Sequence, residues 1–278
     1  MTFALSHNME NHTIILLCNE KQYETKRIIK EGRKKGYEIK TIKTKNFKEK
    51  ILEKSFVLLI RSVTGHMKEA KEIAKNAKTR KIRVIDKKFL TGNFYNKLTA
   101  SNKLSEKNFF QPKTLELNKK NLSEIKKFSS EYVVVKAFIG KRGKKVNKIK
   151  KCELKKFLAQ NTNGRFLAQE FFEAEKEVRV IVIGNKVIGA VEKKASSWKK
   201  NLSANAKANK TKISEKIKKA CIKAAKIFEV EIAGIDVAIS KEKIFVIEVN
   251  RSPGFKHFEK ATGINIAGKI VDYIIKKQ

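Results

Sequence analysis

The sequence predicts an α/β domain followed by a longer α+β region. Three observations support this prediction. Roughly the first ninety residues alternate the patterns of buried strands and amphipathic helices, which is typical of α/β layers. The remainder contains two pairs of strands joined by short turns, which indicates antiparallel hairpins. At 278 residues, the chain is also long enough for two domains or three small ones.

The first region is predicted to follow the order β-α-β-β-α-β. Its strands are short apolar runs, and its helices place apolar side chains at helical spacing on one side. Gly36 is expected to end the first helix, because glycine is common just beyond a helix. We expect strands at His12–Cys18, Tyr37–Ile42, Phe56–Ile60 and Ile82–Ile85, and helices at Gln22–Lys35 and Met67–Ala77.

The second region begins after a polar stretch at about Thr91–Lys107. A basic, glycine-containing loop follows Ala137, and Ser196–Lys210 lacks periodicity and is predicted to be a long loop. Gly184-Asn185 is a two-residue hairpin signal. We expect strands at Tyr132–Ala137, Arg165–Phe172, Val178–Ile183 and Lys186–Val191, and helices at Ile213–Phe228 and Ile264–Ile275.

The chain is strongly basic, with 65 Lys and Arg against 28 Asp and Glu and a formal net charge of +37. Only nine of the basic residues are Arg, the side chain best suited to reading base edges, and aromatic residues are not interleaved among the lysines. We therefore favour lysine-rich solvated faces over a dedicated nucleic-acid surface, which stays open as an alternative. Without a long apolar run, a secretory signal or closely spaced cysteines, the chain is expected to be cytoplasmic, with no membrane contact and no disulfide framework.

A second hairpin, predicted over residues 234–250, combines acidic and apolar residues. If its turn is centred on Glu242, residues whose numbers sum to 484 face each other, which places Asp236 opposite Glu248. Strand alternation then puts Asp236, Glu248 and Asn250 on one face. The other face is expected to pack into the core and contains Ile235, Val237, Ile239, Phe245, Ile247 and Val249.

Two carboxylates that lie directly opposed on a sheet repel each other. A hard divalent cation relieves this repulsion, and two carboxylates with one amide suit Mg²⁺ or Mn²⁺ better than Zn²⁺. Mg²⁺ held by few protein ligands commonly completes its shell with phosphate oxygens. The alternative is that Asp236 pairs with one of the many lysines while Glu248 is a solvated edge residue, and the hairpin alone leaves both interpretations open.

The sequence after the hairpin is more specific. Asn250-Arg251-Ser252-Pro253-Gly254 is followed by Glu259-Lys260-Ala261-Thr262-Gly263-Ile264-Asn265-Ile266-Ala267-Gly268. Together with Asp236 and Glu248, this resembles the C-terminal signature of the RimK-like branch of the ATP-grasp ligases, and a weaker resemblance extends over almost the whole chain. The resemblance implies an α/β N-terminal domain at 1–90, followed by an α+β ATP-grasp fold that clamps ATP between two lobes. The central lobe, at 91–165, would carry a lid loop, and the C-terminal lobe, at 166–278, would carry a metal site.

The resemblance also implies an activity, that of a ligase joining a carboxylate to an amine through an acyl phosphate. The amine would belong to glutamate, and the acceptor would be a protein C-terminus or a small cofactor acid, which Arg61 of the N-terminal domain would help to select. ATP and two Mg²⁺ or Mn²⁺ ions are the implied cofactors. The metal ligands of the family fall on Asp236, Glu248 and Asn250.

Other implied site residues are spread over both lobes. Lys136 matches a lysine that holds nucleotide phosphate, and Lys103 resembles an earlier family lysine, although Asn102 replaces the usual Asp. Arg179 matches a catalytic arginine that stabilises transferring charge, with a salt bridge to Glu170 or Glu192 as the structural alternative. The remaining implied nucleotide contacts are Gln169, Glu170, Phe171 and Phe172 at the adenine, Glu177 at the ribose, and Lys199, Lys200 and Asn201 near the phosphates.

Three departures from the family pattern bear on catalytic competence. Lys145 stands where the glycine-rich lid has its third glycine, and Ser203–Ala206 replaces an A-R-G-G loop. Lys193 and Lys194 stand where the family has arginines, and a lysine does not reproduce the arginine fork. The alternatives to a ligase are therefore a degenerate ATP-grasp protein that binds nucleotide without ligating, and a basic RNA- or ribosome-associated binding protein.

Overall fold

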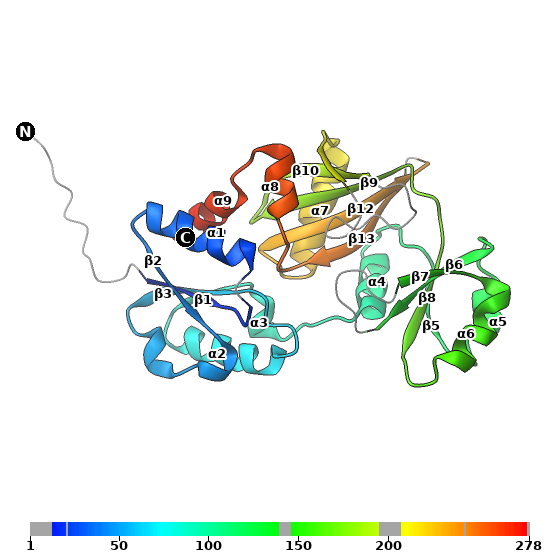
Figure 1. Cartoon of the computed structure of the whole chain (residues 1–278), viewed down its shortest axis with the longest axis horizontal. Helices are drawn as coiled ribbons and strands as arrows, with labels where there is room; N and C mark the ends of the chain where they lie inside the picture. Colours follow the sequence, from blue (N-terminus) through cyan, green and yellow to red (C-terminus); the bar gives the residue numbers. More distant parts are fainter. Residues whose placement is uncertain (1–12, 21, 139–145, 195–206, 242, 277–278) are drawn as a thin grey trace, which may run out of the picture.

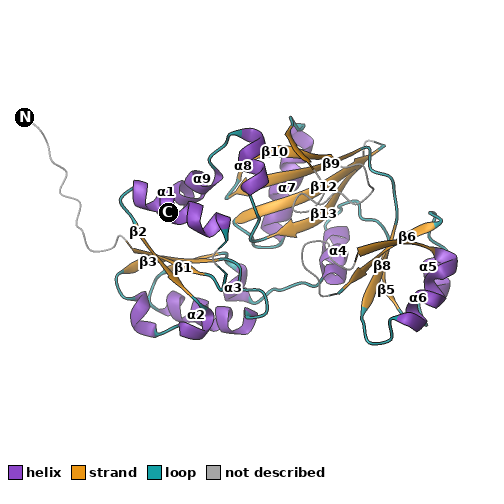
Figure 2. Ribbon diagram, in the orientation of Figure 1, coloured by secondary structure: helices purple, strands orange, loops and turns teal. Residues whose placement is uncertain are grey.

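In a computed structural model of the chain, the structure describes residues 13–20, 22–138, 146–194, 207–241 and 243–276. Within these ranges the strands form three sheets, and helices pack on each of them (Figures 1 and 2). The N-terminal sheet lies beside the C-terminal one, and the sheet from the middle of the sequence lies at the far end of the molecule (Figure 1). No helix within the same ranges has both the length and the apolar character that a membrane span requires.

The N-terminal sheet is parallel and has the strand order β2-β1-β3-β4. Its inner strand β1 is apolar after Thr13, because both faces of the sheet are covered there. Ile14 and Leu16 pack toward α1 (Tyr23–Lys34) and α9 (Ile266–Ile275), whereas Ile15 and Leu17 pack toward α2 (Met67–Thr79). The predicted α/β layer is confirmed; its elements are β1 (Thr13–Leu17), α1 (Tyr23–Lys34), β2 (Glu38–Ile42), β3 (Ser55–Ile60), α2 (Met67–Thr79), β4 (Arg83–Ile85) and the short helices Thr44–Asn46, Glu49–Leu52 and α3 (Lys88–Thr91).

The central sheet is antiparallel and has the strand order β5-β8-β6-β7. One face is covered by α5 and α6, where Val133, Val135 and Ala168 are buried together with Ile125 and Leu154. Strand alternation sends Lys136 and Gln169 to the opposite face. The elements are α4 (Lys97–Glu106), β5 (Thr114–Leu117), α5 (Leu122–Lys126), β6 (Tyr132–Ala137), β7 (Val146–Lys150), the short helix Lys151–Glu153, α6 (Leu154–Gln160) and β8 (Phe166–Glu170).

The C-terminal sheet is also antiparallel, with the strand order β11-β10-β9-β12-β13. Helix α7 covers one face through Cys221, Ala224 and Ala225, which pack on apolar residues of β9 and β12. The predicted long loop over Ser196–Lys210 is wrong at its end, because Lys207–Lys210 pairs with β10. The elements are β9 (Lys176–Ile183), β10 (Lys186–Lys194), β11 (Lys207–Lys210), α7 (Glu215–Ile227), β12 (Ile232–Ser240), β13 (Lys243–Asn250), α8 (Lys256–Thr262) and α9 (Ile266–Ile275).

One apolar core joins the N-terminal and C-terminal sheets. It contains Ile14 and Ile28 from the first sixty residues and Ile183, Phe258 and Ile270 from the last hundred. The central sheet has a separate core. The division at residues 90 and 165 stays a prediction; β8, which begins just after residue 165, pairs with β5 and β6 of the central sheet.

A β-bulge interrupts the predicted register of the β12–β13 hairpin. Asp236 faces Glu248 as predicted, but beyond this pair the register shifts, so that Val237 faces Val246. The prediction that Phe245 and Ile247 pack into the core with the other apolar residues is therefore wrong. Val246 is fully buried there instead, and Phe245 faces Ala238 on the side of Asp236.

Candidate active site

Two adjacent strands bring the predicted metal ligands together, and a third adds Arg179. Asp236 lies in the middle strand β12, with Arg179 of β9 as its partner on one side and Glu248 of β13 on the other. Asn250, two residues after Glu248, faces Gly234 on the same side of the sheet. The register thus places two carboxylates and one amide on one face, as expected from the sequence.

Two cations hold the Asp236 carboxylate. Arg179 Nε and Nη2 donate to Asp236 Oδ1 and Oδ2 at 2.7 and 2.6 Å, a bidentate pair. Lys193 Nζ lies 3.5 Å from Asp236 Oδ1 and 3.3 Å from Glu177 Oε2. Burial opposes ionisation of Asp236, but the charges of Arg179 and Lys193 outweigh it and hold the pKa of this carboxyl at about 2.

These contacts bear on two alternatives that the sequence left open. The partner of Arg179 is Asp236, not Glu170 or Glu192. Lys193 contacts Asp236, and Glu248 is exposed. Both features were expected if the hairpin holds no metal, and both are present in the structure.

Lys136 reaches toward this cluster from the central sheet. Its ammonium donates to Gln169 Oε1 at 2.6 Å, and Gln169 Nε2 donates to Thr114 Oγ1 at 2.9 Å. Burial lowers the pKa of Lys136 to about 8; the negative charge of Glu248 opposes this shift, while the positive charge of Lys97 adds to it. Lys136 therefore lies near enough to Glu248 of the other sheet for the charge of this carboxylate to act on it.

The structure places Lys103 apart from the other predicted residues. Its ammonium lies 5.1 Å from the ring centroid of Tyr95. Lys97, at the start of the same helix and not singled out from the sequence, lies closer to the candidate site: its ammonium donates to Ala137 O at 3.1 Å, next to Lys136. The tripeptide Asn-Lys-Leu occurs twice, six residues apart, and at 3.6 residues per turn the two lysines point to different sides of α4. The two tripeptides differ in the role of their asparagine: the side chain of Asn96 caps the N-terminus of α4, which marks Lys97 as the first residue of the helix.

The residues predicted at the adenine point in different directions. Glu170 accepts hydrogen bonds from Ser129 N and Oγ at 2.6 Å each, so its carboxylate fixes the preceding loop. The Phe171 ring lies 3.8 Å from Lys148 Nζ. Phe172 stacks on Phe245 with ring centroids 4.4 Å apart, a contact that depends on the bulge in β13.

The donor set fits a hard divalent cation. Each carboxylate oxygen has two lone pairs, so Asp236 retains acceptor capacity beside Arg179 and Lys193. Glu248 and Asn250 supply two further oxygens without crossing to another element. No group of three or more His, Cys, Asp or Glu that could hold a metal occurs in the described part of the chain, so a cation here would need the amide of Asn250 as its third protein ligand.

Several predicted site residues lie outside the described residues. They are Lys199, Lys200 and Asn201, the substituted lid position Lys145 and the loop Ser203–Ala206.

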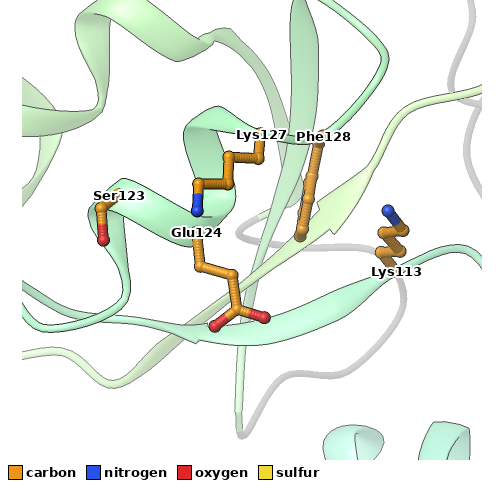
Figure 3. Close-up of a pocket in the computed structure, with 5 residues that line it drawn as sticks. All are labelled: Lys113, Ser123, Glu124, Lys127 and Phe128. Atoms are coloured by element: carbon orange, nitrogen blue, oxygen red, sulfur yellow. The ribbon is translucent and has the colours of Figure 1, made fainter.

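A hollow on the outer side of the central sheet is separate from the Asp236 cluster. It is lined by Lys113, Ser123, Glu124, Lys127 and Phe128. In the view of Figure 3 the Phe128 ring lies between Lys127 and Lys113, and the Glu124 carboxylate points away from the Lys127 ammonium. Phe128 belongs to the core under α5, the face opposite to Lys136 and Gln169, so this hollow does not contribute to the cluster.

The fold and the cluster define a class of protein, the ATP-grasp proteins, and comparison with known families specifies it further. Residues 95–274 match the RimK-like ATP-grasp domain. The chain therefore belongs to the RimK-like ATP-grasp family.

Curated relatives match a shorter part of the chain. A "Probable alpha-L-glutamate ligase" of Legionella pneumophila (strain Paris) is 40% identical over 119 residues, which cover 41% of this chain and 39% of the relative. A protein of the same name from Vibrio parahaemolyticus is 32% identical over 161 residues, or 55% of this chain and 53% of the relative. The matched segments thus span about two fifths to one half of these relatives.

Solved structures share the fold over nearly the whole chain. The ATP-grasp ligase PsnB in complex with a minimal precursor has a TM-score of 0.76 at 17% identity, covering 95% of this chain and 99% of PsnB. The D-alanine–D-alanine ligase of Bacillus anthracis in complex with ATP has a TM-score of 0.69 at 19% identity, covering 95% and 96%. The α/β layer followed by an ATP-grasp fold is therefore confirmed.

Proposed function

We propose that this chain is an ATP-dependent carboxylate–amine ligase that acts through an acyl phosphate. The donor would be the α-amino group of glutamate, and the acceptor a protein C-terminus or a small cofactor acid. The family supports the reaction class, and the names of the curated relatives support glutamate. The observation that carries the proposal is the convergence of Asp236, Glu248 and Asn250 on one face, opposite Lys136.

In this proposal, Asp236, Glu248 and Asn250 hold Mg²⁺. When bound, the metal would neutralise negative charge on the phosphates. Lys136 and Lys97 bind nucleotide phosphate from the central lobe, and Arg179 stabilises negative charge near the transferring phosphoryl group. Lys193 keeps Asp236 and Glu177 in place through its two ion pairs.

The chemistry then needs positioning and charge stabilisation and no covalent bond to the protein. An oxygen of the acceptor carboxylate attacks the γ-phosphorus, the bond to the β-phosphate oxygen breaks, and ADP leaves. The amine attacks the acyl carbon, loses a proton, and inorganic phosphate leaves as the amide forms.

A thermal-shift titration with Mg²⁺-ATP on wild type and Glu248→Ala tests the metal and nucleotide assignment. Ligand that binds the native state raises the melting temperature by mass action, so we expect a shift in wild type and a much smaller one in the variant. No shift in wild type would refute the proposal, and an equal shift in both proteins would refute the metal assignment.

The rival proposal is a nucleotide-binding protein that does not ligate. It is motivated by Asp236, whose two oxygens already accept from Arg179 and Lys193. Hydroxylamine trapping of an acyl phosphate with glutamyl peptides or cofactor acids distinguishes the two. A trapped hydroxamate supports the ligase, whereas ADP release without any hydroxamate supports the rival.

A further inference from the structure

The carboxyl edge of the N-terminal sheet holds two arginines with unmatched donors. Arg61, at the end of β3, is 3% exposed, and its Nη2 donates to Pro253 O at 2.8 Å. Arg251 Nη2 contacts Met67 Sδ at 3.5 Å. The Nη1 atoms of both arginines are buried and have no hydrogen-bond partner among the described residues.

A third unmatched donor lies at the end of the neighbouring strand β1. Asn19 Oδ1 accepts from Thr44 N at 2.9 Å and Thr44 Oγ1 at 3.2 Å, while Asn19 Nδ2 is buried and, within the described ranges, lacks a partner. Asn19 N donates to Ser62 O at 3.4 Å, and Ser62 N donates to Ser252 Oγ at 3.3 Å. Asn19 is therefore tied to the segment that follows the metal ligand Asn250.

The position of these donors in the sheet is informative. The strand order β2-β1-β3-β4 changes direction between β1 and β3. In open parallel sheets, ligands bind outside the carboxyl ends of the strands at such a switch point. Asn19 and Arg61 extend from the two strands that flank it.

Two acidic side chains nearby each accept backbone hydrogen bonds through one of their oxygens, and their charges also act on the arginines. Asp86 Oδ1 accepts from Glu231 N at 2.8 Å and Ile232 N at 3.3 Å. Glu24 Oε1 accepts from Phe255 N at 2.9 Å and Lys256 N at 3.3 Å. The guanidinium groups also lie over aromatic rings, Arg61 at 5.8 Å from the Phe255 centroid and Arg251 at 5.0 Å from that of Phe89.

Buried donors without partners are rare and costly, which indicates that a group other than the described residues accepts from them. Two guanidinium groups and one amide N–H₂ are a donor-only set. A carboxylate is an acceptor-only group whose planar shape matches the guanidinium fork.

We propose that Arg61, Arg251 and Asn19 form a binding site for a substrate carboxylate that is not itself activated. A carboxylate held by two arginines at the N-terminal sheet anchors its molecule while another group of that molecule reacts beside Asn250. The ligand is a small dicarboxylate or amino dicarboxylate. That this ligand is a substrate rests on the proposed function. The presence of the three donors does not depend on the proposed function.

Entry to the site requires a small rearrangement, because the three donor atoms are buried. The connection from β3 to α2 is exposed at Thr64, Gly65 and His66, and it lies between Arg61 and the Met67 that touches Arg251. A shift of this connection uncovers the guanidinium groups.

Titration calorimetry of the full chain, with Mg²⁺ and a non-hydrolysable ATP analogue present, tests the site. The probes are L-glutamate, glutarate and inorganic phosphate, and the variants are Arg251→Lys and Arg61→Lys, which keep the charge but lose the fork. We expect at least one of the two dicarboxylates to bind wild type and either variant to weaken it by about tenfold or more.

Arg83→Lys is the matched control. Arg83 also has a buried Nη2 without a hydrogen-bond partner among the described residues, but it lies on β4 beside Glu231, to which it is joined by a 3.5 Å ion pair. We expect Arg83→Lys to bind the dicarboxylate as wild type does. Equal weakening by all three variants would show a structural effect and overturn the site.

The remaining outcomes are also decisive. If L-glutamate binds and glutarate does not, the ligand is the amine donor. If glutarate binds as well, two carboxylates are sufficient for binding. Both outcomes support the site. No dicarboxylate binding, unchanged binding in both the Arg251 and Arg61 variants, or preference for phosphate overturns it. If the ATP analogue binds while no dicarboxylate does, the site fails but the proposed function stands; if the analogue itself does not bind, the proposed function fails.

Discussion

Two buried aspartates, Asp236 and Asp86, have opposite electrostatic environments. They are 7% and 2% exposed, so burial favours the neutral form of each. Arg179 and Lys193 reverse this for Asp236 and hold its pKa at about 2. Asp86 receives backbone hydrogen bonds from Glu231 and Ile232, but burial prevails and raises its pKa to about 7.

Asp86→Asn is expected to remove a pH dependence of stability. Because the pKa of Asp86 is higher in the native than in the unfolded state, the native state retains a proton between pH 4 and 7 that the unfolded state has lost, and stability falls as the pH rises through this range. The loss from pH 5 to pH 8 should be about 2–4 kcal/mol larger in wild type than in the variant. Urea unfolding at both pH values measures this, and an identical loss in the two proteins would contradict it.

Lys136 should take up a proton when nucleotide binds. Its pKa of about 8 means that at pH 8 about half of the free protein carries the neutral amine, and phosphate favours the charged form. We expect an uptake of up to about 0.5 proton on binding a Mg²⁺-ATP analogue at pH 8. Calorimetry in buffers of different ionisation enthalpy measures it; Lys136→Met should abolish it, and persistence in this variant would assign the proton elsewhere.

At the scale of elements, the hairpin β12–β13 shows how far strand arithmetic extends. The Asp236–Glu248 pair was predicted correctly, but the turn centred on Glu242 was not: next to the turn, partner numbers sum to 483, as in Ser240–Lys243, and the extra residue of the bulge restores the sum of 484 at Asp236–Glu248. The bulge beyond this pair was not predictable, since Phe245, Val246 and Ile247 are all apolar and give no alternation to read. It moves Phe245 onto Phe172.

Gly234→Ala tests the coupling between this hairpin and the segment after Asn250. A Cβ at Gly234 would lie 2.6 Å from Pro253 Cβ, so the segment must shift. We expect the Mg²⁺ concentration needed for nucleotide binding to rise about tenfold, because small displacements of a ligand are costly. Gly189→Ala is the matched control on the same sheet, where the Cβ meets the end of the Ile264 side chain at 3.1 Å; an equal rise in both variants would refute the coupling.

At the scale of the whole molecule, the net charge of +37 is a property of the surface and not of the site. Many exposed lysines repel one another, and the folded state concentrates this repulsion. The cluster at Asp236 is instead nearly balanced, with two cations from Arg179 and Lys193 beside the carboxylates of Asp236, Glu177 and Glu248.

Added salt should therefore stabilise the protein. Raising NaCl from 50 to 500 mM shortens the screening length and should increase the melting temperature by a few degrees, roughly 2–6 °C. A melting temperature that falls with salt would contradict this. RNA binding with a steep salt dependence would revive the nucleic-acid alternative.

The sequence alone determined the α/β layer, the hairpins, the face that carries Asp236, Glu248 and Asn250, and the family resemblance. Each follows from local periodicity or from a motif within a few dozen residues. The tertiary structure decided which charges meet: Arg179 with Asp236, Lys97 with the strand of Lys136, and Arg61 with Pro253. Among 65 basic residues, sequence spacing does not rank partners, because each pairing depends on how separate sheets and helices pack.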